Sequence, residues 1–145
     1  MLTVNCQLMS AKTTITKILH ALIFGVLFIW QLPQNIVALF IILFSKTEGK
    51  IAYRNYCFAL KVRMPKRASG VSLGSFALIS PPFAKDDETV RHELDGHTVD
   101  SKIFGPLYLL VIGLPSVLHL WRYDGSKDYY DFYTERWANK HAGLE

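Results

Sequence analysis

The part of the chain that organises the rest is Thr89-Val90-Arg91-His92-Glu93-Leu94-Asp95-Gly96-His97-Thr98-Val99-Asp100-Ser101. It places two histidines, His92 and His97, and the glutamate Glu93 within six residues. Acidic residues at 86–88 and a threonine precede them, as at the start of a solvated helix. That interpretation accounts for the acids and leaves two histidines unexplained. Two imidazoles and a carboxylate are what a hydrolytic zinc site uses as metal ligands and base.

The spacing of the two histidines differs by one residue from that of a regular metal-binding helix. In the His-Glu-x-x-His pattern the histidines lie about 40° apart around the helix. His92 and His97 are five apart, which puts them about 140° apart on a regular α-helix. Three arrangements remain open: a one-residue π-bulge, a helix that ends at Gly96, or another ligand set such as Glu93, His97 and Asp100.

Length, charge and cysteine content narrow the class of protein. The chain has 145 residues, about one domain, and half of them are hydrophobic. The net charge is +4, and residues 46–67 carry seven Lys and Arg against one acid, Glu48. Basic residues beside an apolar segment favour the cytoplasmic face of a membrane, and no nucleic-acid-binding pattern is present. Cys6 and Cys57 have no Cys-x-x-Cys partner, so we expect free, reduced thiols.

The first apolar run predicts association with a lipid bilayer. Residues 18–44 contain no charged side chain, and about 20 residues suffice for a helical span. The sequence Gln31-Leu32-Pro33-Gln34-Asn35 should break this helix near Leu32. One kinked span and a re-entrant hairpin of two short arms, 18–30 and 36–44, both remain open. The length of the run and its lack of a small-x-small site argue against a cleaved signal peptide.

Five other segments have recognisable patterns. Residues 1–17 are expected to be a polar tail, and 51–62 a strand or a basic linker. Residues 70–80 alternate as a strand that Pro81-Pro82 ends. Residues 103–121 form a second apolar run, interrupted by glycines and prolines, which is a short span or a broken, packed segment. Residues 127–141 are predicted to be a helix, with Gly143 as its stop.

The sequence Glu135-Arg136-Trp137-Ala138-Asn139 offers the third protein ligand that a zinc site needs. Together with the histidine stretch it resembles the gluzincin class of zinc peptidases, in which a Glu-x-x-Ala-Asp helix follows a His-Glu-x-x-His helix. Membrane-bound relatives include the prenyl-protein endopeptidase type. The resemblance implies that His92, His97 and Glu135 bind Zn²⁺, that Glu93 is the general base, and that Asn139 orients a ligand. Residues 71–79 also resemble the edge strand of compact gluzincins, to which substrate can add.

Residues 105–116 and 132–140 further resemble a group of small bacterial membrane proteins that usually read His-Glu-x-Gly-His. The resemblance covers most of the chain from Leu32 onward and departs at the extra residue, Leu94 or Asp95. It implies a bacterial inner-membrane protein, and the basic residues place the site on the cytoplasmic side.

We therefore predict an α+β fold: a mostly helical zincin-like core with a small edge sheet and hydrophobic membrane-associated helices. Residues 1–45 would be the tail and the membrane-associated segment or hairpin, and 46–145 the zincin-like domain. The predicted function is a membrane-associated, zinc-dependent metallopeptidase acting on a peptide or protein. The alternative is a catalytically degenerate zincin-like membrane protein with a binding or structural role. The sequence does not rank the candidates for stabilising an oxyanion, which are Tyr129, Tyr130, Tyr133 and His119. We do not expect the other histidines to bind a metal; they are His20, His119 and His141.

Overall fold

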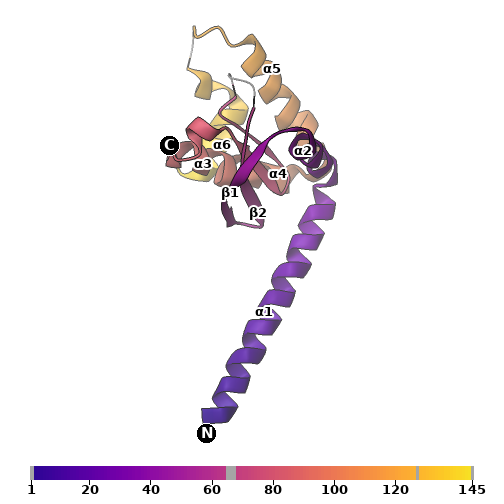
Figure 1. Ribbon diagram of the computed structural model, residues 1–145. Helices are drawn as coiled ribbons and strands as arrows, with labels where there is room; N and C mark the ends of the chain where they lie inside the picture. Colours follow the sequence, from indigo (N-terminus) through magenta and orange to yellow (C-terminus); the bar gives the residue numbers. More distant parts are fainter. Residues whose placement is uncertain (1, 65–67, 127, 145) are drawn as a thin grey trace.

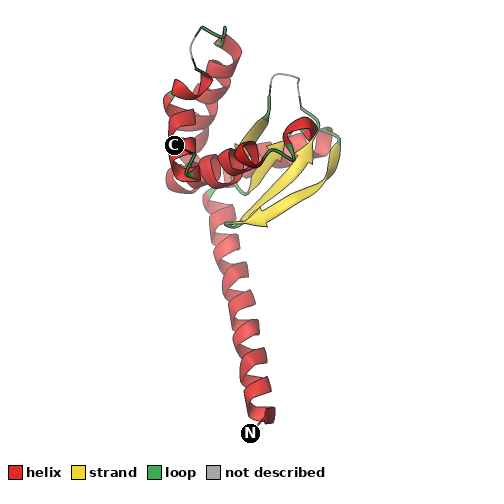
Figure 2. Cartoon of the chain, turned by 90° about the vertical axis from the view of Figure 1, so that its left-hand side faces the viewer, coloured by secondary structure: helices red, strands yellow, loops and turns green. Residues whose placement is uncertain are grey.

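The computed structural model describes residues 2–64, 68–126 and 128–144, and for residues 2–12 it describes the backbone alone. The expectations for Lys66 and Arg67, and for the side chains of Cys6 and Lys12, therefore lie outside the described residues. The chain is a mixed α+β structure in which a small sheet lies beside the helices and one long helix extends away (Figures 1 and 2). The main elements are α1 (Leu2–Trp30), α2 (Leu32–Phe44), β1 (Thr47–Arg54), β2 (Cys57–Val62), β3 (Gly70–Leu73), β4 (Phe76–Ile79), α3 (Asp87–Arg91), the π-helix η2 (His92–His97), α4 (Thr98–Phe104), α5 (Leu114–Arg122) and α6 (Tyr133–Ala142).

The first apolar run forms two helices that meet at Gln31. Pro33 lies in the first turn of α2, where a backbone N–H would have no acceptor within the helix, so its missing N–H costs nothing. The same residue prevents α1 from continuing. The predicted break is thus confirmed, but the expected polar tail is helical from Leu2. Within α1, the segment Thr13–Trp30 is long and apolar enough to cross a bilayer, by length and composition alone. Figure 1 shows α1 extending away from the rest of the fold, whereas α2 lies beside the sheet. The two helices therefore do not fold back on each other as a hairpin.

The polar residues at the break attach α2 to the rest of the fold. Gln34 Nε2 donates to the carbonyl of Gly105 at 2.8 Å, and Asn35 Oδ1 accepts from Ser75 N at 2.7 Å. Both side chains are fully buried. These contacts explain why amides interrupt an otherwise apolar run, because a buried amide needs hydrogen-bond partners.

The sheet has the strand order β1-β2-β4-β3, and β2 and β4 are parallel while the outer pairs are antiparallel. Each of the two predicted strands is in fact a hairpin. Residues 51–62 reverse at Asn55 and Tyr56, whose φ angles of 53° and 59° are those of a type I′ turn. Residues 70–80 reverse at Gly74-Ser75, where φ of Gly74 is 65°. Within residues 71–79, β3 lies at an edge of the sheet and β4 lies between β3 and β2, so the expected edge strand is wrong in its second half.

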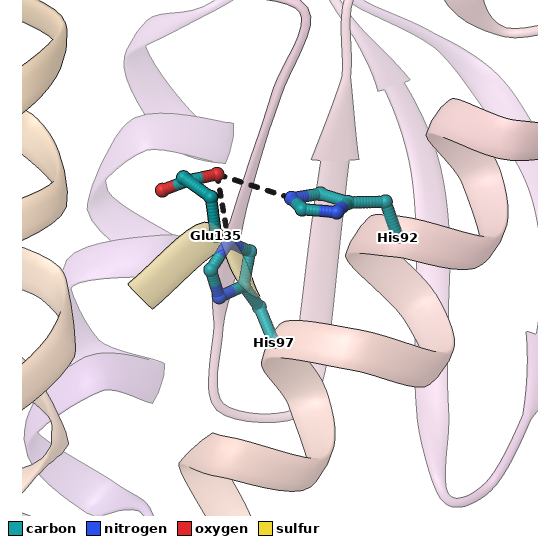
Figure 3. Close-up of side chains that lie close together, drawn as sticks. All are labelled: His92, His97 and Glu135. Carbon is teal, nitrogen blue, oxygen red and sulfur yellow. Dashed lines mark hydrogen bonds and ion pairs between the residues drawn. The ribbon is translucent and has the colours of Figure 1, made fainter. Parts of the chain in front are cut away.

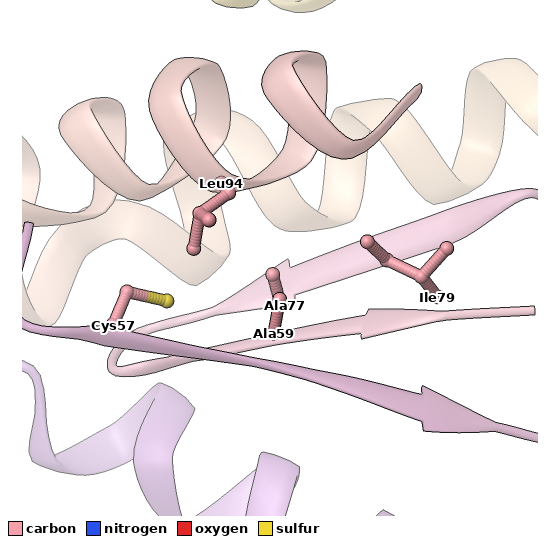
Figure 4. Packing of buried hydrophobic residues seen from close by; sticks show 5 residues of the cluster. All are labelled: Cys57, Ala59, Ala77, Ile79 and Leu94. Carbon is pink, nitrogen blue, oxygen red and sulfur yellow. The ribbon is translucent and has the colours of Figure 1, made fainter. Parts of the chain in front are cut away.

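One face of the sheet packs against the helix that carries the histidines. Figure 4 shows the side chains of this cluster, which are Cys57, Ala59, Ala77, Ile79 and Leu94. Cys57 is a free thiol, as expected, and burial raises its pKa to about 12. The two alanines leave room for the helix to approach the sheet closely. This close approach holds η2 at a fixed distance from β2 and β4.

The C-terminal half is a broken helical path. The path bends by 117° between the helical stretch 87–107 and the stretch 109–122, so the second apolar run is not one straight span. Gly105, with φ of 49°, ends α4 shortly before this bend. The helix predicted over 127–141 starts at Tyr133, and Gly143 stops it in the left-handed conformation, as predicted.

Candidate metal centre

The helix that carries the histidines begins as the acidic cluster predicted. Asp86 caps α3, and its carboxylate accepts hydrogen bonds from the backbone N–H and the hydroxyl of Thr89. After one turn the α-helix passes into the π-helix η2, His92–His97, and returns to α-helix at Thr98. Thr98 Oγ1 donates to the carbonyl of Leu94 within this transition.

The π-helix resolves the spacing of the histidines. Its hydrogen bonds join residues five apart, so residues five apart lie near one another along the same side. The rings of His92 and His97 have centroids 4.8 Å apart and are nearly perpendicular. Of the three arrangements that the sequence left open, the structure has the π-bulge.

Glu135 meets both histidines from α6. Its Oε2 lies 3.2 Å from His92 Nε2 and 3.5 Å from His97 Nε2 (Figure 3). All three residues are buried, and their ligand atoms lie within 4.8 Å of one another. Among the described residues this is the single group of three or more acidic, histidine or cysteine side chains with that geometry.

Gly96 allows α6 to come this close. A Cβ at position 96 would lie 2.5 Å from the carbonyl oxygen of Ala138 and 2.9 Å from its carbonyl carbon. Ala138 is itself fully buried and lies between Glu135 and Asn139. The glycine is therefore required by the approach of two backbones and not by its φ angle.

The ring nitrogens that face away from Glu135 have their own partners. His92 Nδ1 lies 2.7 Å from Asn139 Oδ1, so an Nδ1–H donates to the amide oxygen, and Nε2 is the nitrogen that faces Glu135. His97 Nδ1 lies 3.5 Å from the buried carboxylate of Asp100. The other oxygen of Asp100 lies 3.0 Å from His141 Nδ1. Asn139 thus lies where an orienting residue was predicted, and Asp100 and His141 support the second ring.

The groups around Glu135 keep its carboxylate ionised. Burial alone would raise the pKa of Glu135, but hydrogen bonds from His92, His97 and Ser116 and the charge on His97 hold it well below its usual range. Burial alone would lower the pKa of His97, but the carboxylates of Asp100, Glu135 and Glu93 raise it to about 10. Without a metal, a proton on His97 therefore supplies the positive charge that Glu135 requires.

Glu93 lies on the same helix and is held from β3. Its Oε2 accepts a hydrogen bond from Ser72 Oγ at 2.7 Å, and the same hydroxyl lies 2.8 Å from the Glu93 carbonyl. The side chain of Glu93 is buried and occupies the space that a Cβ on Gly70 would need. The structure therefore fixes one carboxylate oxygen of Glu93 on the edge strand.

A cavity of about 770 Å³ extends from this group. Its polar end is formed by the site residues together with Tyr129 and Tyr130, and the Tyr130 ring lies 5.6 Å from the His92 ring. The other two oxyanion candidates are engaged elsewhere: Tyr133 donates to the carbonyl of Val111, and His119 Nε2 lies 3.0 Å from the carbonyl of Tyr129. Tyr129 and Tyr130 are therefore the two candidates that line the cavity.

Sequence reasoning missed three supports of this site. Ser72 and Ser116 carry no signal in their local sequence, since both act on carboxylates far along the chain. His141 was expected to be an ordinary histidine, yet it contacts Asp100. Asp100 was considered only as an alternative metal ligand beside His97, and its spacing of three from His97 was the available signal.

Comparisons with protein-family models, curated proteins and solved structures found no match to this chain. The function of this protein is therefore inferred from the geometry of the site.

Proposed function

We propose that this protein is a membrane-anchored, zinc-dependent metallopeptidase with a zincin-like arrangement of the gluzincin type. The observation that carries the proposal is the convergence of the ligand atoms of His92, His97 and Glu135 on one buried point. These residues come from two helices, and Glu135 lies 43 positions after His92 in the chain. Two imidazoles and one carboxylate are the ligand set of a known class of catalytic zinc sites, which leaves a fourth position for water.

The donor set fits zinc in chemistry, and two of its three ligand separations fit zinc in size. Zinc binds imidazole nitrogen and carboxylate oxygen at about 2.1 Å, so tetrahedral ligands lie about 3.4 Å from one another. The two distances from Glu135 Oε2, 3.2 Å and 3.5 Å, match that separation. The hydrogen bond from His92 to Asn139 gives the tautomer that metal binding requires.

Bound zinc would supply a Lewis acid and lower the pKa of a water molecule toward about 7. Glu93 would accept the proton of the attacking water and pass it to the leaving amine. Ser72 would hold the Glu93 carboxylate in place during both transfers, since it donates to Oε2. Tyr129 and Tyr130 would donate to the substrate carbonyl oxygen as negative charge develops there.

The cavity indicates the kind of peptide. Away from the site it is lined by apolar residues of α2 and α5, among them Val37, Ile41, Leu114 and Val117. Burial of apolar side chains is worth about 25 cal/mol per Å², so this lining favours peptides with large apolar side chains. The edge strand β3 also lines the cavity and would accept an extended peptide as an added strand.

The surface supports attachment to a bilayer. Apolar side chains are exposed along α1, α2 and α5, for example Val26 at 68 %, Leu43 at 76 % and Trp121 at 77 %. Single exposed apolar residues are ordinary, but three helices covered with them are typical of a lipid-facing surface. The basic residues after α2 would lie at the cytoplasmic face of a bacterial inner membrane.

A catalytically degenerate relative is the second candidate. The observation that favours it is Asn139, which replaces the aspartate of the gluzincin pattern and is a weaker acceptor for His92. Such a protein would retain the fold and a metal while acting as a binding or structural protein. The two candidate functions differ only in whether the protein cleaves peptides.

Zinc content and peptide cleavage separate these candidates. We expect one zinc per chain in detergent-purified protein, lost in both His92→Ala and Glu135→Ala, because each removes a ligand. Protein without zinc would refute the metal site and leave a membrane protein whose polar helices only pack.

Cleavage of an apolar peptide library then tests catalysis. Glu93→Gln should retain zinc and lose cleavage, whereas the matched control Glu88→Gln, at an exposed acid on α3, should retain both. Zinc binding without cleavage by the native protein would favour the degenerate relative.

A further inference from the structure

Asp95, one of the two candidates for the extra residue in the histidine helix, is bound by the β1–β2 hairpin. Its Oδ1 accepts from Arg54 Nε at 2.9 Å and from Asn55 Nδ2 at 3.0 Å, and its Oδ2 accepts from an Arg54 guanidinium NH₂ group. The carboxylate is thus bound at both oxygens by two consecutive residues of one turn. Ion pairs of this fork-like geometry fix orientation as well as position.

The hairpin is a firm support for such a contact. Arg54 ends β1 and pairs with Cys57, which is fully buried against the helix. Asn55 follows in the left-handed conformation, and this turn directs its amide to the same carboxylate as Arg54. Because β2 is hydrogen-bonded to β4 in the centre of the sheet, the turn has a fixed place relative to η2.

A π-helical turn needs such a support. The π-helix is rare and occurs mostly as single turns inside α-helices, so a segment of this sequence has the regular α-helix as its local alternative. If residues 92–97 returned to a regular α-helix, His92 and His97 would lie about 140° apart and could not share one ion. Asp95 lies between the two histidines, where an external anchor acts directly on the bulge.

We propose that the Arg54–Asn55 turn is a positioning device that holds the π-bulge through Asp95 and so keeps His92 and His97 convergent. The inference rests on the proposed metal site for its functional meaning. Arg54 and Asp95 touch no metal ligand in this role. They act on the backbone that carries the ligands.

The test compares two ion pairs of the same hairpin. Arg54→Ala and Asp95→Ala remove the anchor, and Arg63→Ala removes the Arg63–Glu48 pair, 3.1 Å, at the other end. We expect zinc affinity to fall about two- to fivefold in the anchor variants, because the ion pair is partly exposed and acts on the ligands only through the backbone. The visible spectrum of Co²⁺ in the site should change with them, because it reports ligand geometry. Arg63→Ala should leave affinity and spectrum as in the native protein.

A second measurement decides the proposal in protein without metal. Hydrogen exchange of the amides of residues 92–98 should be faster in Arg54→Ala than in native protein, and unchanged in Arg63→Ala. The charge-swapped pair, Arg54→Asp with Asp95→Arg, should restore part of the protection and of the affinity. Native exchange rates in Arg54→Ala would overturn the proposal whether or not zinc binds. Failure of the native protein to bind zinc would instead refute the proposed function alone.

Discussion

Replacing Gly96 by Ala tests whether the close approach of η2 and α6 builds the metal centre. The new Cβ would lie 2.5 Å from the Ala138 carbonyl oxygen, about 0.9 Å inside an ordinary contact of about 3.4 Å. The neighbouring atoms are backbone, so α6 itself must move. In an open helix the same change would stabilise the protein by about 1 kcal/mol. Overpacking of a tight interface costs about 1–3 kcal/mol, so we expect a net loss of stability.

The displacement should affect metal binding more than folding. Metal–ligand distances tolerate about 0.2 Å, and a shift approaching 0.9 Å at Ala138 carries the adjacent Glu135 and Asn139 with it. We therefore expect zinc affinity to fall at least tenfold, measured by titration against a chromophoric chelator. The melting temperature in detergent should fall by several degrees.

The matched control is Gly25→Ala in α1, where nothing lies within 4 Å of the added Cβ. It should leave zinc affinity unchanged and not lower the melting temperature. Native zinc affinity and native melting in Gly96→Ala would show that α6 does not approach as described, and the site would have to be abandoned.

The surroundings of the two histidines allow four more tests. Asn139→Asp gives His92 Nδ1 a charged acceptor, so zinc affinity should rise about tenfold in the same titration; a lower affinity would contradict the orienting role. Zinc must displace the proton of His97, whose pKa is raised to about 10, so affinity should rise about tenfold per pH unit between pH 7 and 9. Without metal that proton stabilises the fold below pH 6.5 and is lost toward pH 10, so melting temperatures measured in a chelator should fall over this range. Deleting Asp95 removes the extra residue and with it the bulge, so the histidines would lie four apart and about 40° apart on a regular α-helix; zinc binding should be retained, and its loss would contradict the view that the bulge only accommodates this residue.

Local patterns in the sequence predicted the limits of several elements. Pro33 broke the first apolar run, Asp86 capped α3, and Gly143 ended α6, because each acts on its own backbone within a turn. The two hairpins were missed although Gly74-Ser75 is a two-residue turn signal between apolar stretches. Asn55-Tyr56 carries a weaker signal, since tyrosine rarely adopts positive φ.

The sequence by itself determined which residue types are available to a metal site: two histidines and a glutamate within six residues, and a Glu-x-x-Ala-Asn stretch in a later helix. It left open how histidines five apart are arranged, because a regular helix, a bulge and a turn are all compatible with the local sequence. The tertiary structure decided in favour of the bulge. Its determinants are contacts between distant segments, in which Arg54 and Asn55 hold Asp95 and the bare backbone of Gly96 admits α6. Such contacts depend on where the sheet and α6 lie, and no local pattern encodes that position.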